Sequence, residues 1–83
     1  MAEDEVLFSS REVRDRADVV AFLRNLASAM EQGALELHEG EQKVSMSLPG
    51  QLDIEVELDE DTDDPEKVGH SLEIEIEWTE GED

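Results

Sequence analysis

Apolar and acidic residues alternate without a break over residues 72–78, which read Leu-Glu-Ile-Glu-Ile-Glu-Trp. Successive side chains of a β-strand point to opposite faces of the sheet, whereas a helix would scatter the same residues around its circumference. Residues 52–59 repeat the pattern as Leu-Asp-Ile-Glu-Val-Glu-Leu-Asp. The two stretches therefore predict strands with one apolar and one acidic face. We expect these apolar residues to be buried: Leu52, Ile54, Val56, Leu72, Ile74 and Ile76.

A different period, with apolar residues three and four positions apart, runs from residue 19 to residue 30 and predicts an amphipathic helix over residues 16–32. Asp15 is expected to cap its N-terminus, with Asp18 three residues later as in a capping box. Gly33 is the expected C-terminal stop. The apolar stripe, including Phe22 and Leu26, is expected to face the sheet.

Shorter alternating runs predict further strands over residues 6–13, 34–38 and 43–48, beside the two near 51–60 and 67–79. The connections between the last four strands are short, which favours an antiparallel meander, since parallel strands need a crossover of a dozen or more residues. The predicted fold is α+β: one amphipathic helix packed on one face of an antiparallel sheet of about five strands, in the order β-α-β-β-β-β. We expect a single domain over residues 1–83, ordered from about residue 5 to residue 79.

Three features together resemble the Amphi-Trp domain family: the helix opening at residues 15–24, the closing Gly33, and the alternating strand at residues 72–78 that ends in tryptophan. The resemblance covers residues 5–78, and the last strand is its most specific part. The family usually opens its helix with serine and glutamate, where this chain has Asp15 and Asp18, so the capping chemistry is kept. The resemblance implies the fold, a cytoplasmic location and a saline habitat typical of salt-loving archaea. It implies no activity and transfers no functional residue.

The strongly negative net charge excludes two classes of binding partner. The chain has 25 acidic against 6 basic residues and a net charge of −19. Such a charge repels nucleic acid and anionic membrane surfaces, so neither is expected as a direct partner. Acidity with scarce lysine is expected of a protein in molar salt, where the Debye length falls to about 3 Å. No cysteine, signal-like N-terminal stretch or long apolar run occurs, so a cytoplasmic protein is expected.

The acidic face is the first candidate site. Like charges about 5 Å apart in water repel by roughly 0.8 kcal/mol, so a row of them is destabilising at low salt. The face is either a surface for a partner and for hydrated monovalent cations, or a solvated surface adapted to salt. If the last two strands pair, its members are Asp53, Glu55, Glu57, Asp59, Glu73, Glu75 and Glu77.

Neither a metal site nor a catalytic constellation is predicted. An EF-hand loop starting at Asp59 would place Asp64 where glycine is needed and His70 where glutamate is needed. His38 and His70 are too few for a zinc site. No serine has a sequence cue for an activating base, and no phosphate-binding loop occurs. We expect no enzyme activity and no cofactor.

Arg11, Arg14 and Trp78 complete the candidate partner surface. The arginines lie between the first predicted strand and the helix, where they either dock an acidic partner or pair with local acids such as Glu12. Trp78 either closes the core against the helix or anchors a partner. The sequence favours a small non-catalytic binding or accessory module of a salt-adapted cytoplasm. The alternative is an acidic nucleic-acid mimic that occupies a basic groove of a DNA-binding protein.

Overall fold

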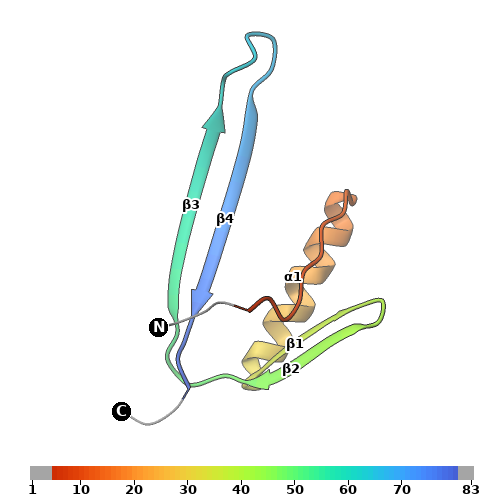
Figure 1. Ribbon diagram of the computed structural model, residues 1–83, viewed down its shortest axis with the longest axis vertical. Helices are drawn as coiled ribbons and strands as arrows, with labels where there is room; N and C mark the ends of the chain where they lie inside the picture. Colours follow the sequence, from red (N-terminus) through yellow and green to blue (C-terminus); the bar gives the residue numbers. More distant parts are fainter. Residues whose placement is uncertain (1–4, 81–83) are drawn as a thin grey trace. The chain divides into compact units, whose positions relative to one another are not determined.

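The computed structural model describes residues 5–80 and contains one helix and four strands over that range. The elements are α1 (Arg16–Glu31), β1 (Ala34–Glu39), β2 (Gln42–Ser47), β3 (Asp53–Asp61) and β4 (Gly69–Glu77), as labelled in Figure 1. The chain divides into two compact units at Leu48 and Pro49. The first unit contains α1, β1 and β2, and the second contains β3 and β4. The α+β class predicted from the sequence is confirmed.

Helix α1 begins at the predicted residue and ends at Glu31, one residue before the predicted end, but its N-terminus is held differently. Asp15 is the N-cap residue, yet its side chain makes no capping hydrogen bond. Instead its backbone carbonyl accepts bonds from the amides of Asp18 (3.0 Å) and Val19 (3.1 Å). At the other end Gly33 has φ +88°, in the left-handed region, and its amide donates to the Met30 carbonyl at 2.9 Å. Glycine adopts this conformation without a side-chain penalty, so it ends the helix and turns the chain into β1.

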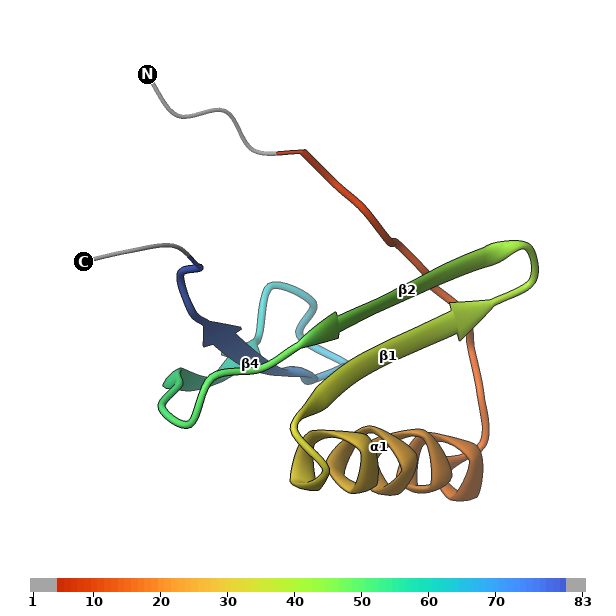
Figure 2. The same ribbon diagram turned by 90° about the horizontal axis from the view of Figure 1, so that it is seen from below.

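Strands β1 and β2 form an antiparallel hairpin with Leu37 opposite Val44 and Leu35 opposite Met46. Its two-residue loop contains Gly40, whose φ of +57° suits a tight hairpin turn. Helix α1 packs against β1 (Figure 2). Leu26 and Met30, in the second half of the helix, are half-buried, whereas Phe22 keeps 51% of its surface exposed. The helix stripe is therefore buried mainly where α1 approaches its C-terminus.

The strand predicted at residues 6–13 is wrong, because the structure assigns no strand to residues 5–15. Val6 is 78% exposed, while Phe8 is half-buried. One side chain replaces the missing strand ladder: the Gln42 amide donates to the Ser9 carbonyl at 3.0 Å, and its oxygen accepts from the Ser9 amide at 3.3 Å. The alternation here is too short, and too interrupted by charged residues, to form a strand.

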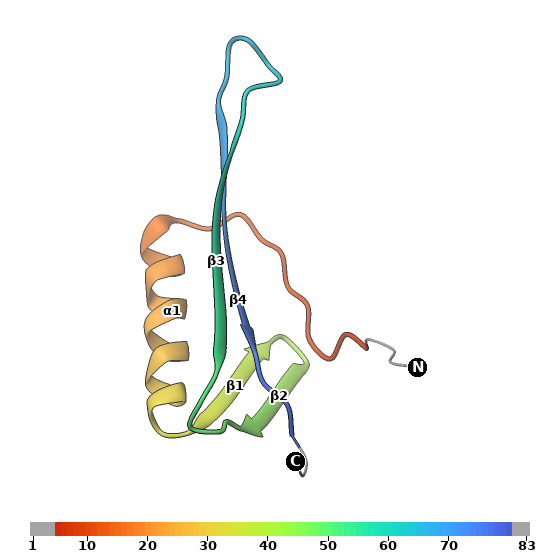
Figure 3. The same ribbon diagram turned by 90° about the vertical axis from the view of Figure 1, so that its left-hand side faces the viewer.

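Strands β3 and β4 form a second antiparallel hairpin, whose strands twist about each other (Figure 3). Ile54 lies opposite Ile76, Val56 opposite Ile74, and Leu58 opposite Leu72. The register therefore places all six of these apolar side chains on one face of the hairpin. The acids between them fall on the other face, as the alternation predicts.

The single sheet of about five strands is wrong, since the described strands form two two-stranded sheets. The ladder of β2 ends at Ser47, shortly before Pro49 and Gly50. Proline donates no ladder hydrogen bond and glycine weakens a strand, so this dipeptide interrupts the meander.

The predicted burial of the apolar face is also wrong for most of its members. Ile54, Val56, Leu72 and Ile74 each keep more than half of their surface exposed, and only Leu52 and Ile76 are half-buried. A two-stranded hairpin is a single layer, so its own unit supplies nothing to cover this face. The alternating pattern specified the face correctly, but it did not specify the cover.

Candidate functional site

The seven carboxylates predicted to share a face do share one face of the β3–β4 hairpin, and we call them the acidic ladder. Three acid pairs oppose each other directly across the strands: Asp53 with Glu77, Glu55 with Glu75, and Glu57 with Glu73. Asp59 faces Ser71 instead, so the ladder loses its second row towards the loop. Like charges directly opposite each other destabilise a strand pair. The members are Asp53, Glu55, Glu57, Asp59, Glu73, Glu75 and Glu77.

Glu75 is the electrostatic centre of the acidic ladder, because it has Glu55 across the strand pair and Glu77 two residues along its own strand. A hydrogen bond with Glu77 and then the charge of Glu77, followed by the same two effects from Glu55, raise the pKa of Glu75 to about 6. Neighbouring negative charges favour the neutral form of a carboxyl group. At mildly acidic pH a larger fraction of Glu75 is consequently protonated than of an ordinary glutamate.

Two groups within the acidic ladder bring their oxygens close enough to share a cation. Glu55, Glu75 and Glu77 form one group, with ligand atoms within 4.8 Å of one another. The other consists of Glu57, Asp59 and Glu73. All six side chains are exposed, and calcium takes six to eight oxygen ligands. Three exposed carboxylates suit loose association of hydrated cations better than a specific coordination shell.

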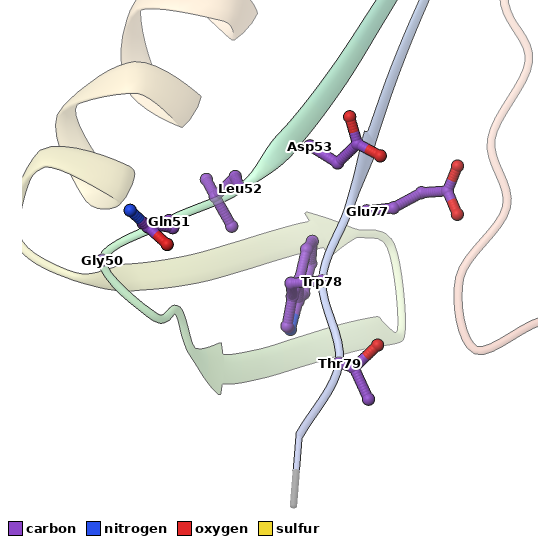
Figure 4. Close-up of a pocket in the computed structure, with 7 residues that line it drawn as sticks. All are labelled: Gly50, Gln51, Leu52, Asp53, Glu77, Trp78 and Thr79. Carbon is purple, nitrogen blue, oxygen red and sulfur yellow. The ribbon is translucent and has the colours of Figure 1, made fainter. Parts of the chain in front are cut away.

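Trp78 lies at the open end of the same hairpin, just after β4. Leu52 lies just before β3, and both residues have the sequence parity of the apolar face. Figure 4 shows both apolar side chains among the residues that line a hollow at this end of the hairpin, with the carboxylates of Asp53 and Glu77 pointing away from them. Trp78 is half-buried. An amphipathic ring beside acidic side chains is a suitable anchor for a partner. The hollow is lined by Gly50, Gln51, Leu52, Asp53, Glu77, Trp78 and Thr79.

The loop between β3 and β4 uses its carboxylates to hold its own backbone. Asp61 accepts a bond from the Asp63 amide at 3.0 Å, and Asp64 accepts one from the Glu66 amide at 2.9 Å. Both are local turns of the kind that aspartate commonly forms. His70 lies opposite Glu60, on the apolar side of the register.

The two arginines of the predicted partner surface belong to the first unit, away from the acidic ladder in the sequence. Arg14 donates to Glu12 at 2.7 Å and lies 4.0 Å from Glu39. The hydrogen bond from Arg14, reinforced by one involving Glu39, lowers the pKa of Glu12, and the same pairing raises the pKa of Arg14. The structure thus favours local pairing for Arg14. Arg11 is exposed.

A groove beside Arg14 is the feature that the sequence did not reveal. It lies in the first unit, between residues 8–14, the first half of α1 and the end of β1. Phe8 and Phe22, far apart in the sequence, line it together. The apolar side chains of residues 6–8 were the only available signal, and the expectation of a strand there assigned them to a sheet.

The family model for the Amphi-Trp domain matches residues 1–83, so the chain belongs to this family. Comparison with curated proteins and with solved structures gives no match. No helix within residues 5–80 has the length and apolar character that crossing a membrane requires.

Proposed function

We propose that this Amphi-Trp domain protein is a small, non-catalytic binding module of a salt-adapted cytoplasm, which contacts a protein partner through the acidic ladder and Trp78. The proposal involves no reaction and no cofactor. Hydrated monovalent cations accompany the acidic ladder without a fixed site.

The observation that carries the proposal is the β3–β4 register. It places three acid pairs directly opposite each other, and Trp78 directly follows β4 at the open end of the hairpin. Opposed acids cost stability, and a fold that needed only solubility could keep its acids apart. The carboxylates are held close together, since the ligand oxygens of Glu55, Glu75 and Glu77 lie within 4.8 Å of one another. A partner with basic residues around an apolar pocket would neutralise the acidic ladder and receive the indole.

The test compares three baits in native lysate at high salt. They are the wild-type protein, a ladder variant (Glu55→Gln, Glu57→Gln and Glu75→Gln), and a control that removes three acids elsewhere (Glu31→Gln, Glu36→Gln and Glu41→Gln). Both variants have a net charge of −16, since each removes three of the charges that give −19. The expected result is a protein retained by the wild type and the control but lost with the ladder variant. That protein, purified, should then bind Trp78→Ala more weakly. Equal retention by all three baits would refute a role for the acidic ladder.

A nucleic-acid mimic is the second candidate, and charge spacing limits which nucleic acid it resembles. Residues on one face of a strand recur about every 6.8 Å, and two opposed rows therefore supply one charge per about 3.4 Å. Duplex DNA presents one charge per about 1.7 Å of its axis, and one strand presents one per about 3.4 Å. The acidic ladder matches the charge density of a single strand and has half that of a duplex. If the protein is a mimic, its target is a groove for single-stranded nucleic acid.

Competition distinguishes the two candidates. A mimic should displace a labelled single-stranded oligonucleotide from a basic single-strand-binding protein, and the ladder variant should do so much less well than the matched control. No displacement at a protein concentration that saturates the partner identified above would leave the binding module as the function.

A further inference from the structure

The groove in the first unit is open to solvent and is bounded by three separate stretches of the chain. Residues 8–14 form one wall, the first half of α1 another, and the end of β1 the third, around a volume of about 660 Å³. Ligand sites in proteins are commonly about 300–1,000 Å³. Figure 2 shows residues 5–15 passing the β1–β2 hairpin close to its turn, where the Gln42 amide holds Ser9. The wall that residues 8–14 supply is therefore fixed to the hairpin.

The lining combines apolar side chains with an acidic rim. Phe8, Val19, Phe22 and Leu37 supply the apolar surface. Val19 and Phe22 remain 46% and 51% exposed, so the groove presents apolar surface that the unit itself leaves in contact with water. Covering such surface is favourable in proportion to its area, by about 25 cal/mol per Å².

Three carboxylates and one guanidinium surround this surface: Glu12, Asp18, Glu39 and Arg14. Arg14 is already committed to Glu12 at 2.7 Å. Glu39 lies further from Arg14, at 4.0 Å, and accepts a long hydrogen bond of 3.4 Å from the Ser10 hydroxyl. Asp18 contributes a further negative charge from the first turn of α1. His38 also lines the groove, and with histidine counted as neutral at pH 7 one guanidinium offsets three carboxylates, so the rim is negative.

We infer that this groove is a second interaction surface, separate from the acidic ladder, which receives a short segment of a partner protein with an apolar side chain next to an arginine or lysine. The apolar side chain would lie against Phe8, Phe22 and Leu37. The adjacent cation would reach Asp18 and Glu39, the two acids that Arg14 leaves least compensated. Charge complementarity selects this occupant over an anionic amphiphile, because Glu12 already pairs with Arg14, the guanidinium at the rim.

The test uses the full chain, labelled with ¹⁵N, and short capped peptides in 1 M potassium chloride. At that salt concentration the Debye length is about 3 Å, so only charges in direct contact add to affinity. The probe peptide contains one leucine beside one arginine among glycines and serines. In two matched peptides, serine replaces the leucine or glutamate replaces the arginine. The expected result is that only the probe shifts amide resonances of residues 8–22 and 37–39.

Variants of the protein test the apolar contact and the ion pair separately. Phe22→Ser should weaken binding of the probe by about fivefold or more, because it removes apolar contact area. Asp18→Asn should weaken binding by about twofold to fivefold, the value of an exposed ion pair. Glu41→Gln makes the same charge change outside the groove and should leave affinity unchanged. If Phe22→Ser does not fold, the three peptides on the wild-type chain still decide the question. Equal binding of the serine or glutamate peptide, or shifts confined to β3 and β4, would overturn the inference.

Discussion

Salt should stabilise the β3–β4 hairpin, and most of the effect should come from the acidic ladder rather than from net charge. The perturbation is the ladder variant, with glutamine at positions 55, 57 and 75. In the β3–β4 register it removes both partners of the Glu55–Glu75 pair and one partner of the Glu57–Glu73 pair. Only the Asp53–Glu77 pair keeps two directly opposed charges.

The expected size of the salt effect follows from the distance between the carboxylates. Ligand oxygens in each cluster lie within 4.8 Å of one another. Screening multiplies a Coulomb interaction over about 5 Å by about 0.85 in 0.01 M salt, where the Debye length is about 30 Å, and by about 0.2 in 1 M salt, where it is about 3 Å. Repulsion within the acidic ladder should therefore fall about fourfold across this range. The ladder variant starts with two of its three opposed pairs already relieved, so it should gain much less from added salt.

Urea unfolding followed by Trp78 fluorescence measures this, because Trp78 directly follows β4 and reports on the same unit. The wild-type midpoint should rise steeply from millimolar to molar potassium chloride, equally with sodium chloride, since screening has no site. The charge-matched control (Glu31→Gln, Glu36→Gln and Glu41→Gln) should keep most of the wild-type slope. A wild-type midpoint that stays flat with salt would refute the reasoning. Equal slopes in both variants would show that net charge is responsible, and a midpoint that rises with micromolar calcium alone would indicate a specific metal site.

Three further outcomes are expected from single substitutions. Because the pKa of Glu75 is about 6 in the folded chain against 4.5 ordinarily, the folded state takes up a proton between these values. Stability at low salt should therefore rise on acidification from pH 7 to pH 5, and Glu75→Gln should remove that part of the rise in urea midpoints measured across pH. Leu26→Ala, at a half-buried helix position, should lower the free energy of unfolding by about 1–2 kcal/mol, measured by thermal unfolding followed by circular dichroism. Phe22→Ala should lower it less, because Phe22 is half-exposed. The opposite order would mean that α1 packs through another face. Gly33→Ala should lower the free energy of unfolding by about 1–2 kcal/mol, because φ is +88° there. No atom crowds the new Cβ, so the loss comes from the backbone conformation alone. Gly50→Ala, at a position without positive φ, is the matched control and should leave stability nearly unchanged in the same assay.

The sequence by itself determined the elements whose cause is local. The helix runs from residue 16 to residue 31 because its apolar period is 3.6 and glycine at position 33 tolerates a left-handed backbone. The acidic ladder lies on one face of β3 and β4 because a strand alternates its side chains strictly. The helix requires no distant part of the chain, and the acidic ladder requires only that the neighbouring strands β3 and β4 pair in this register. The family also follows from the sequence, since the model of the Amphi-Trp domain matches residues 1–83.

Only the tertiary structure decided how these elements pair and what surrounds them. Alternation at residues 6–13 predicted a strand, but a strand needs a partner edge, and the chain supplies a single glutamine side chain instead. The alternating pattern could not show that β2 and β3 belong to two separate hairpins, because register and partner choice depend on contacts far apart in the sequence. The groove beside Arg14 was hidden for the same reason. Phe8, Phe22 and Leu37 come from three distant stretches, and only folding brings them to one surface.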